Sequence, residues 1–243
     1  MEKQNFMNGP INRNENVGST AITKSFLSNV FTYMSAALAI TGIVAYWFGT
    51  DLSLLSLMYS AEGGMNLFGY FVLFAPLGLV LLMSARFHKL SSVGLVALFI
   101  FFSILMGMSL SSVFAIYTGS SIASTFFITS ATFTSMAILG YTTKTDLTKF
   151  GSILMMGVFG IIIASVVNMF MQSGMMDLII SIAGVLIFTG LTAYDVQKLK
   201  RIGSGVEYGT DETNKLAIMG ALSLYLDFIN IFLFLLRFMG DRK

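Results

Sequence analysis

Two aspartates lie inside otherwise hydrophobic runs of this chain, Asp195 in LIFTGLTAYDVQ and Asp227 in ALSLYLDFINIFLF. The other ten of the twelve acidic residues lie in polar tails, in loops or at the ends of hydrophobic segments. A carboxylate at membrane depth costs at least a few kcal/mol, so such a group is usually paired, protonated or in contact with water. The two aspartates are therefore candidate functional residues.

The two hydrophobic runs follow each other in the chain and are expected to pack as an antiparallel hairpin. If the carboxyl groups meet, they share one proton and titrate as a unit. The protonated pair ties the helices together, whereas the ionised pair repels and either opens them or coordinates a hard cation such as calcium. We therefore predict that Asp195 and Asp227 are a proton-sensing, ion-gating pair and candidate calcium ligands.

Asp227 is the deepest charge, because it lies twelve residues after Lys215, a helical rise of about 18 Å. Ser223, Asp227 and Asn230 are spaced i, i+4 and i+7 and share one face of a helix. Such a polar stripe is expected to face the bundle interior or a hydrated cavity. The alternative is that Asp227 is a buried carboxylic acid bonded to Ser223 or Asn230.

Asp195 lies near the end of its hydrophobic run, with Lys198 three residues later. An interfacial charge in an ordinary surface ion pair with Lys198 is therefore the alternative to a functional role. Arg86 is a candidate for balancing an aspartate, although an anchor at the membrane surface is the favoured interpretation.

The composition indicates an all-α, polytopic membrane protein. The chain has 243 residues, of which 56% are hydrophobic and 11% are charged, against roughly 25% charged in soluble domains. A net charge of +2 is too small and too dispersed to indicate nucleic-acid binding. Cysteine is absent, which excludes disulfides, thiolate metal sites and a cysteine nucleophile. No cofactor is expected.

Seven segments are long and apolar enough to span a bilayer, which takes about 20 residues each. A turn cluster, Thr118-Gly119-Ser120, divides the longest uncharged stretch into two spans. The expected organisation is a disordered cytoplasmic tail over residues 1–25, a seven-helix membrane domain over 26–239 and a short basic tail over 240–243. The predicted spans are Phe26–Gly49, Asn66–Ala85, Ser92–Tyr117, Ser121–Tyr141, Phe150–Gln172, Leu178–Gln197 and Leu216–Leu236.

Lysine and arginine predict the orientation, because they accumulate in cytoplasmic loops. With the N-terminus in the cytoplasm, the basic residues on that side are Lys3, Arg13, Lys24, Arg86, Lys89, Lys144, Lys149, Lys198, Lys200, Arg201 and Lys215. An odd number of spans places the basic end of the chain, RFMGDRK, outside. The seventh segment therefore either crosses the bilayer or is re-entrant, and its length favours crossing.

Small residues predict one close helix contact. Gly157, Gly160 and Ala164 share one face of the fifth span, the pattern that lets membrane helices approach each other.

The segments GLTAYDVQKLK (190–200), ALSLYLDFINIFLFLLRFMG (221–240) and SIASTFFITSATFTSMAILGYTTKTDLTKFG (121–151) resemble the Bax inhibitor-1 family, the last one its bacterial branch. The resemblance implies seven helices with the last one central, and it implies that Asp195 and Asp227 match the family's proton-sensing aspartates. It also implies a pH-dependent calcium leak, or regulation of membrane proteolysis, in the bacterial inner membrane. An acidic residue that some members carry in the second span is absent from FAPLGLVLLMSA.

The function predicted from the sequence is a pH-sensitive calcium leak gated by the aspartate pair, with the lipid bilayer, calcium ions and protons as partners. The alternative is a non-transporting regulator that binds a membrane protease or a stress-response partner. An enzyme such as a diaspartyl membrane protease is disfavoured, because AYDVQ and YLDFIN lack the glycine-rich setting expected around its aspartates.

Overall fold

The computed structural model describes the backbone of residues 13–60, 64–207 and 209–243, with side chains from residue 21 onward. Within these ranges the chain is helical, and seven of the helices are long and apolar enough to cross a membrane. The predicted all-α fold with seven spans is confirmed. The helices are α1 (Arg13–Thr50), α2 (Leu52–Leu55), α3 (Leu67–Ala85), α4 (Ser92–Ile116), α5 (Gly119–Thr142), α6 (Thr148–Met171), α7 (Gly174–Gly203) and α8 (Asp211–Met239).

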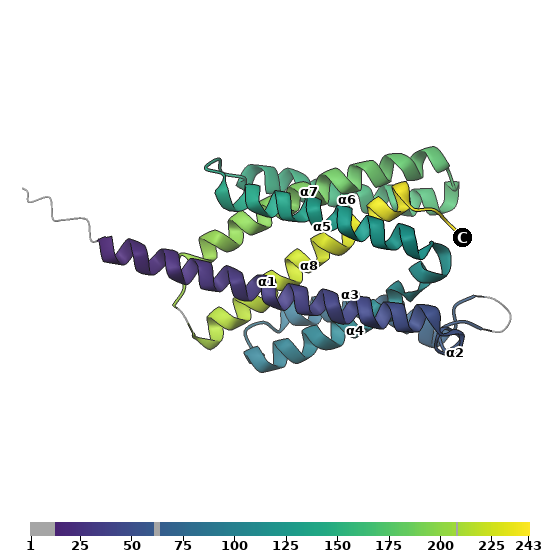
Figure 1. The fold of residues 1–243 in the computed structure, drawn as a ribbon, viewed down its shortest axis with the longest axis horizontal. Helices are drawn as coiled ribbons and strands as arrows, with labels where there is room; N and C mark the ends of the chain where they lie inside the picture. The colour runs from purple at the N-terminus through teal and green to yellow at the C-terminus, as the bar shows by residue number, and fades with distance from the viewer. Residues whose placement is uncertain (1–12, 61–63, 208) are drawn as a thin grey trace, which may run out of the picture.

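The last helix, α8, is the core of the bundle. Its most apolar window is 61% buried, whereas the corresponding windows of the other spans are 11–39% buried. Helices α1, α4, α5 and α7 pack against it, while α3 packs on α4 and α6 packs on α7. Figure 1 shows α8 running diagonally between a group formed by α1, α3 and α4 and a group formed by α5, α6 and α7. The predicted central position of the last helix is confirmed, with α3 and α6 one layer further out.

Tyr225 joins three helices at the centre of the bundle. Its side chain is fully buried and its ring packs edge-on against Phe99 and Phe102 of α4. Its hydroxyl lies 2.8 Å from Thr41 Oγ1 of α1, and Thr41 donates its own proton to the carbonyl of Ser103 at 3.0 Å. Tyr225 is therefore the donor to Thr41, and this chain of bonds ties α8, α1 and α4 together.

Tyr225→Phe is expected to lower the free energy of unfolding by about 0.5–1.5 kcal/mol, the net value of one hydrogen bond, because Thr41 keeps its bond to Ser103. Denaturant unfolding in detergent measures this difference. Tyr70→Phe is the control, since Tyr70 is 52% exposed on α3 and its loss of a hydroxyl should leave stability unchanged. Equal stability of both variants with the parent chain would show that the Tyr225 bond contributes nothing.

The first helix begins earlier than expected. It starts at Arg13, so residues 13–25 of the predicted disordered tail are helical, while residues 1–12 of that tail lie outside the described part of the chain. The side chains of Thr23 and Phe26 are already buried. Extending an existing helix by one residue is far easier than starting a new helix. A stable apolar span therefore extends its helical structure into the polar residues that precede it.

The end of the chain lies at the opposite end of the bundle from the start of α1 (Figure 1). The backbone N–H of Thr118 donates to Asp241 O at 3.1 Å, and the N–H of Lys243 donates to Ile116 O at 2.9 Å. These bonds fasten the basic tail to the α4–α5 connection. The seventh predicted span is thus one continuous helix, α8, that does not turn back as a re-entrant segment would.

Candidate functional site

The two aspartates lie on the α7–α8 hairpin, and glycines set how these helices fit together. A Cβ at Gly220 would overlap the side chain of Leu199, and a Cβ at Gly184 would lie 2.5 Å from the ring of Phe234. Each glycine therefore accommodates a large side chain of the facing helix. This register places Asp195 of α7 opposite the middle of α8.

Ser223 is the residue that connects the two helices at the site. Its Oγ donates a hydrogen bond of 2.5 Å to Asp195 Oδ2. Asp227 lies four residues later on the same face of α8, one helical turn deeper. Asp227 is 5% exposed and Asp195 is partly buried. The structure thus links Asp195 to Ser223, which lies one helical turn from Asp227 on α8.

Asp227 does not form the hydrogen bond to Ser223 or Asn230 that the alternative interpretation predicted. Ser223 donates to Asp195, and the Asn230 side-chain amide donates to the carbonyl of Leu226 at 2.8 Å. Asp227 Oδ2 is buried and makes no hydrogen bond to the described protein groups. The interpretation of Asp227 as an acid bonded to Ser223 or Asn230 is therefore wrong.

Sequence reasoning missed Thr189. Its Oγ1 is the other buried side-chain polar atom without a hydrogen-bond partner among the described residues. Thr189, Thr192 and Asp195 follow one another at intervals of three on α7, a spacing that forms a polar ridge along a helix. That spacing was visible in LIFTGLTAYD and could have identified Thr189.

The predicted basic partners are not held at the pair. The side chain of Lys198 is exposed, and the ion pairs formed within the described ranges join other residues. Arg86 is the exposed C-cap of α3, which packs on α4 rather than on α7. The surface ion pair between Asp195 and Lys198 is therefore not formed, and Arg86 remains at the surface, as the favoured interpretation held.

Carboxylates in the loops have a different electrostatic setting. Hydrogen bonds from Thr148 and the nearby Arg201 guanidinium, 3.3 Å away, hold the pKa of Asp146 below its usual range. Hydrogen bonds from Ser53 lower the pKa of Asp51 in the same way. A lowered pKa keeps both groups ionised throughout pH 5 to 8, so a pH response within that range does not arise from them.

The predicted calcium ligands can be compared with what calcium requires. Calcium takes six to eight oxygen ligands. The described residues contain no group of three or more histidine, cysteine, aspartate or glutamate side chains that could hold a metal ion. The predicted calcium ligands Asp195 and Asp227 therefore offer fewer protein ligands than a calcium ion takes, and their binding of calcium stays a prediction.

Comparison with known proteins identifies the family of the chain. Residues 23–243 match the family described as "Inhibitor of apoptosis-promoting Bax1". The chain belongs to the Bax inhibitor family. This result confirms the resemblance seen in the sequence, and it extends over the whole seven-helix bundle.

Bacterial members of the Bax inhibitor family are similar along nearly their full length. A protein of Borreliella burgdorferi is 46% identical over 222 residues, which cover 91% of this chain and 94% of the relative. The "Inner membrane protein YbhL" of Escherichia coli K12 is 41% identical over 221 residues, covering 90% and 93%. A Rickettsia prowazekii protein is 42% identical over 221 residues, covering 90% and 91%.

Proposed function

We propose that the Asp195–Asp227 pair gates a pH-sensitive leak of calcium or a similar cation through the bundle. The observation that carries this proposal is the unequal environment of the two carboxylates. Asp195 accepts a bond from Ser223, whereas Asp227 has a buried oxygen without a protein partner in the middle of the most buried helix. A buried carboxylate with spare acceptor capacity can accept a proton or a cation.

The gating step follows from charge. A single proton shared by the two groups removes one charge and lets the α7–α8 hairpin stay closed. When both groups are ionised, repulsion acts across the contact that Ser223 makes with Asp195. The helices then separate, or a cation enters between the carboxylates. Flux that rises with pH would point to opening by repulsion, and flux that falls with pH would point to an ionised pair that retains the cation.

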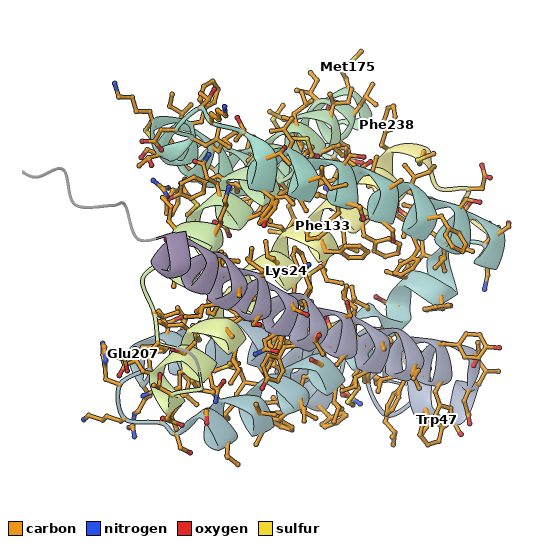
Figure 2. The ribbon with its side chains drawn as sticks, turned by 60° about the vertical axis from the view of Figure 1, so that its left-hand side comes forward. Lys24, Trp47, Phe133, Met175, Glu207 and Phe238 are labelled. Carbon is orange, nitrogen blue, oxygen red and sulfur yellow. The ribbon has the colours of Figure 1, made fainter. Side chains whose placement is uncertain are left out.

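Calcium flux into proteoliposomes between pH 5 and 8 tests the proposal. Flux of the native chain is expected to change across this range, and Asp195→Asn or Asp227→Asn is expected to remove the change. Glu207→Gln is the matched control, because Glu207 lies in the loop joining the same two helices, at the end of the bundle away from Trp47 (Figure 2).

His88→Gln is the second control, since histidine ordinarily changes charge within this pH range. Both control variants should keep the native pH profile. Folded native protein that carries no more calcium than empty vesicles at any pH would refute the leak.

The orientation proposed for this function places the start of α1 in the cytoplasm of a bacterium, with the bundle in the inner membrane. The E. coli relative is named an inner membrane protein. Basic residues dominate the described loops and helix ends on the side where α1 begins, and such loops stay cytoplasmic. These residues are Lys24, Arg86, Lys89, Lys144, Lys149, Lys198, Lys200, Arg201 and Lys215.

A second candidate function is a non-transporting regulator that binds a membrane protease or another membrane partner. Helix α6 favours it, because its most apolar window is only 11% buried and exposes large side chains such as Phe159 and Ile163. Flux discriminates between the two functions, since a regulator would carry no calcium while retaining its fold.

A further inference from the structure

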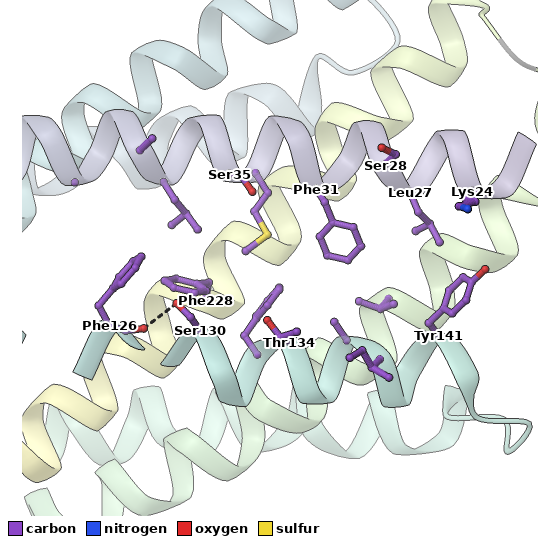
Figure 3. A pocket seen from close by; sticks show the side chains of 18 of the residues that line it. Lys24, Leu27, Ser28, Phe31, Ser35, Phe126, Ser130, Thr134, Tyr141 and Phe228 are labelled. Atoms are coloured by element: carbon purple, nitrogen blue, oxygen red, sulfur yellow. Dashed lines mark hydrogen bonds between the residues drawn. The ribbon is translucent and has the colours of Figure 1, made fainter. Parts of the chain in front are cut away.

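A deep groove separates α1 from α5. Both helices pack on α8, and Phe228 of α8 lies between them at the floor of the groove. The groove has a volume of about 1020 Å³ and a mostly apolar lining, with Phe31 on the α1 side and Phe133 on the α5 side. Figure 3 shows Lys24 and Tyr141 at one end of the groove and Phe126 and Phe228 toward the other. Most of the groove therefore lies at the depth of the apolar spans.

A second, polar pocket of about 410 Å³ adjoins this groove at its basic end. Tyr141 lines both cavities. Lys144, Lys200 and Arg201 line the polar pocket, and Asp146 is its one acidic residue. With Lys24 at the end of the groove, four cations surround the junction and one carboxylate opposes them.

Only some of these charges are satisfied within the protein. Arg201 pairs with Asp146 at 3.3 Å, and Lys200 Nζ donates to the carbonyl of Tyr141 at 2.7 Å. Lys24 and Lys144 are exposed and take no part in the ion pairs of the described residues. The polar pocket therefore retains positive charge directed at the mouth of an apolar groove.

We propose that the groove and the polar pocket together form a binding site for one anionic phospholipid. The headgroup phosphate lies in the polar pocket, near Lys24 and Lys144, and an acyl chain lies along the groove over Phe31 and Phe133. An apolar groove open to a bilayer is filled by lipid chains, and basic pockets between membrane helices favour anionic headgroups. Ser35 lies eleven residues beyond Lys24, about 16 Å along α1, within reach of a chain from that leaflet.

The inference does not rest on the proposed leak, because Lys24, Lys144 and Ser35 lie on or beside α1 and α5, although Val196 and Phe228, which follow the two aspartates in the chain, also line the groove. Its occupancy can be measured with the full chain in vesicles. Phosphatidylglycerol and phosphatidylcholine carrying the same spin label on an acyl chain report how many lipids the protein immobilises and how strongly it prefers one headgroup.

The native chain is expected to prefer phosphatidylglycerol severalfold. Lys24→Gln/Lys144→Gln should remove most of that preference, because each cation near an anionic lipid contributes up to about fivefold. Neither lysine takes part in an ion pair of the described residues, so the fold should survive. Ser35→Phe should lower immobilisation of both lipids alike, because it fills the groove without changing charge.

Arg86→Gln/Lys89→Gln is the matched control, since it removes two cations from the same end of the bundle beside α3, away from the groove. It should leave the preference intact. Equal immobilisation of the two lipids by the native chain would overturn the proposal. A control variant that loses as much preference as Lys24→Gln/Lys144→Gln would do so as well, because the effect would then belong to the surface charge as a whole.

Discussion

Asp227→Leu is expected to raise the free energy of unfolding by about 1–3 kcal/mol, the usual cost of a buried polar group left without a hydrogen bond. Asp227 is 5% exposed, and its Oδ2 finds no partner among the described groups of the protein. Leucine removes this unsatisfied oxygen and any repulsion from Asp195, and its side chain has the same number of heavy atoms as that of aspartate. The same substitution should abolish the pH dependence of flux.

Unfolding in detergent at fixed pH measures the gain in stability. Asp227→Asn is the informative companion, because its carboxamide loses the charge but still buries polar atoms, so it should gain less than leucine does. A leucine variant less stable than the native chain would show that the Asp227 carboxyl group contributes net stabilising interactions, contrary to the environment described above.

The expected gain in stability on replacing Asp227 bears on the function of this residue. A buried residue that lowers stability is typical of sites where activity needs it. Asp195 differs, because it accepts a bond from Ser223 and lies nearer the end of its helix. We therefore expect Asp227 to determine how the pair responds to protons and Asp195 to fix where Asp227 meets α7.

The spans could be predicted because each one is a continuous apolar run bounded by polar or turn residues. Thr118 was placed in a turn and is the N-cap of α5, its side chain accepting a bond from the N–H of Ser121. The start of α1 could not be predicted in this way, since residues 13–25 are polar and their helix is propagated from the apolar span that follows.

The aspartate pair could be predicted because charged residues are rare in apolar runs. Its hydrogen bonds could not be predicted. Periodicity placed Ser223 on the face of Asp227, as the structure does. Periodicity could not show that Ser223 donates a hydrogen bond across the hairpin to Asp195. That bond depends on the axial position of α7 relative to α8. That axial position comes from the fit of the Leu199 side chain against Gly220, a contact between residues on different helices.

The small-residue pattern on α6 was right at one position and wrong at another. A Cβ at Gly157 would lie 2.7 Å from Ile187 of α7, so this glycine accommodates a neighbour. At Gly160 a Cβ would meet nothing within 4 Å, so the predicted contact is absent there. Spacing identifies a face of small residues, whereas the rotation of the helix decides which of them meets a partner.

Gly140→Ala is expected to lower the free energy of unfolding by about 1–3 kcal/mol, the typical cost of overpacking a close contact. The added Cβ would overlap the backbone carbonyl of Ala193 on α7, and a backbone atom cannot rotate away as a side chain does. Helices α5 and α7 would have to separate. Gly160→Ala is the matched control, where the same methyl group enters open space on α6 and should be neutral or stabilising by up to about 1 kcal/mol.

The effect of Gly140→Ala should extend to the aspartate pair, because Ala193 lies two residues before Asp195. Gln197 also fixes this part of α7, donating to Thr145 O at 2.8 Å and accepting from the N–H of Leu147 at 2.9 Å. Moving α7 away from α5 shifts Asp195 relative to Ser223. The variant should therefore lose both stability in detergent and the native pH profile of flux, while Gly160→Ala keeps both. Unchanged stability in Gly140→Ala would show that α5 and α7 are not in backbone contact at this point.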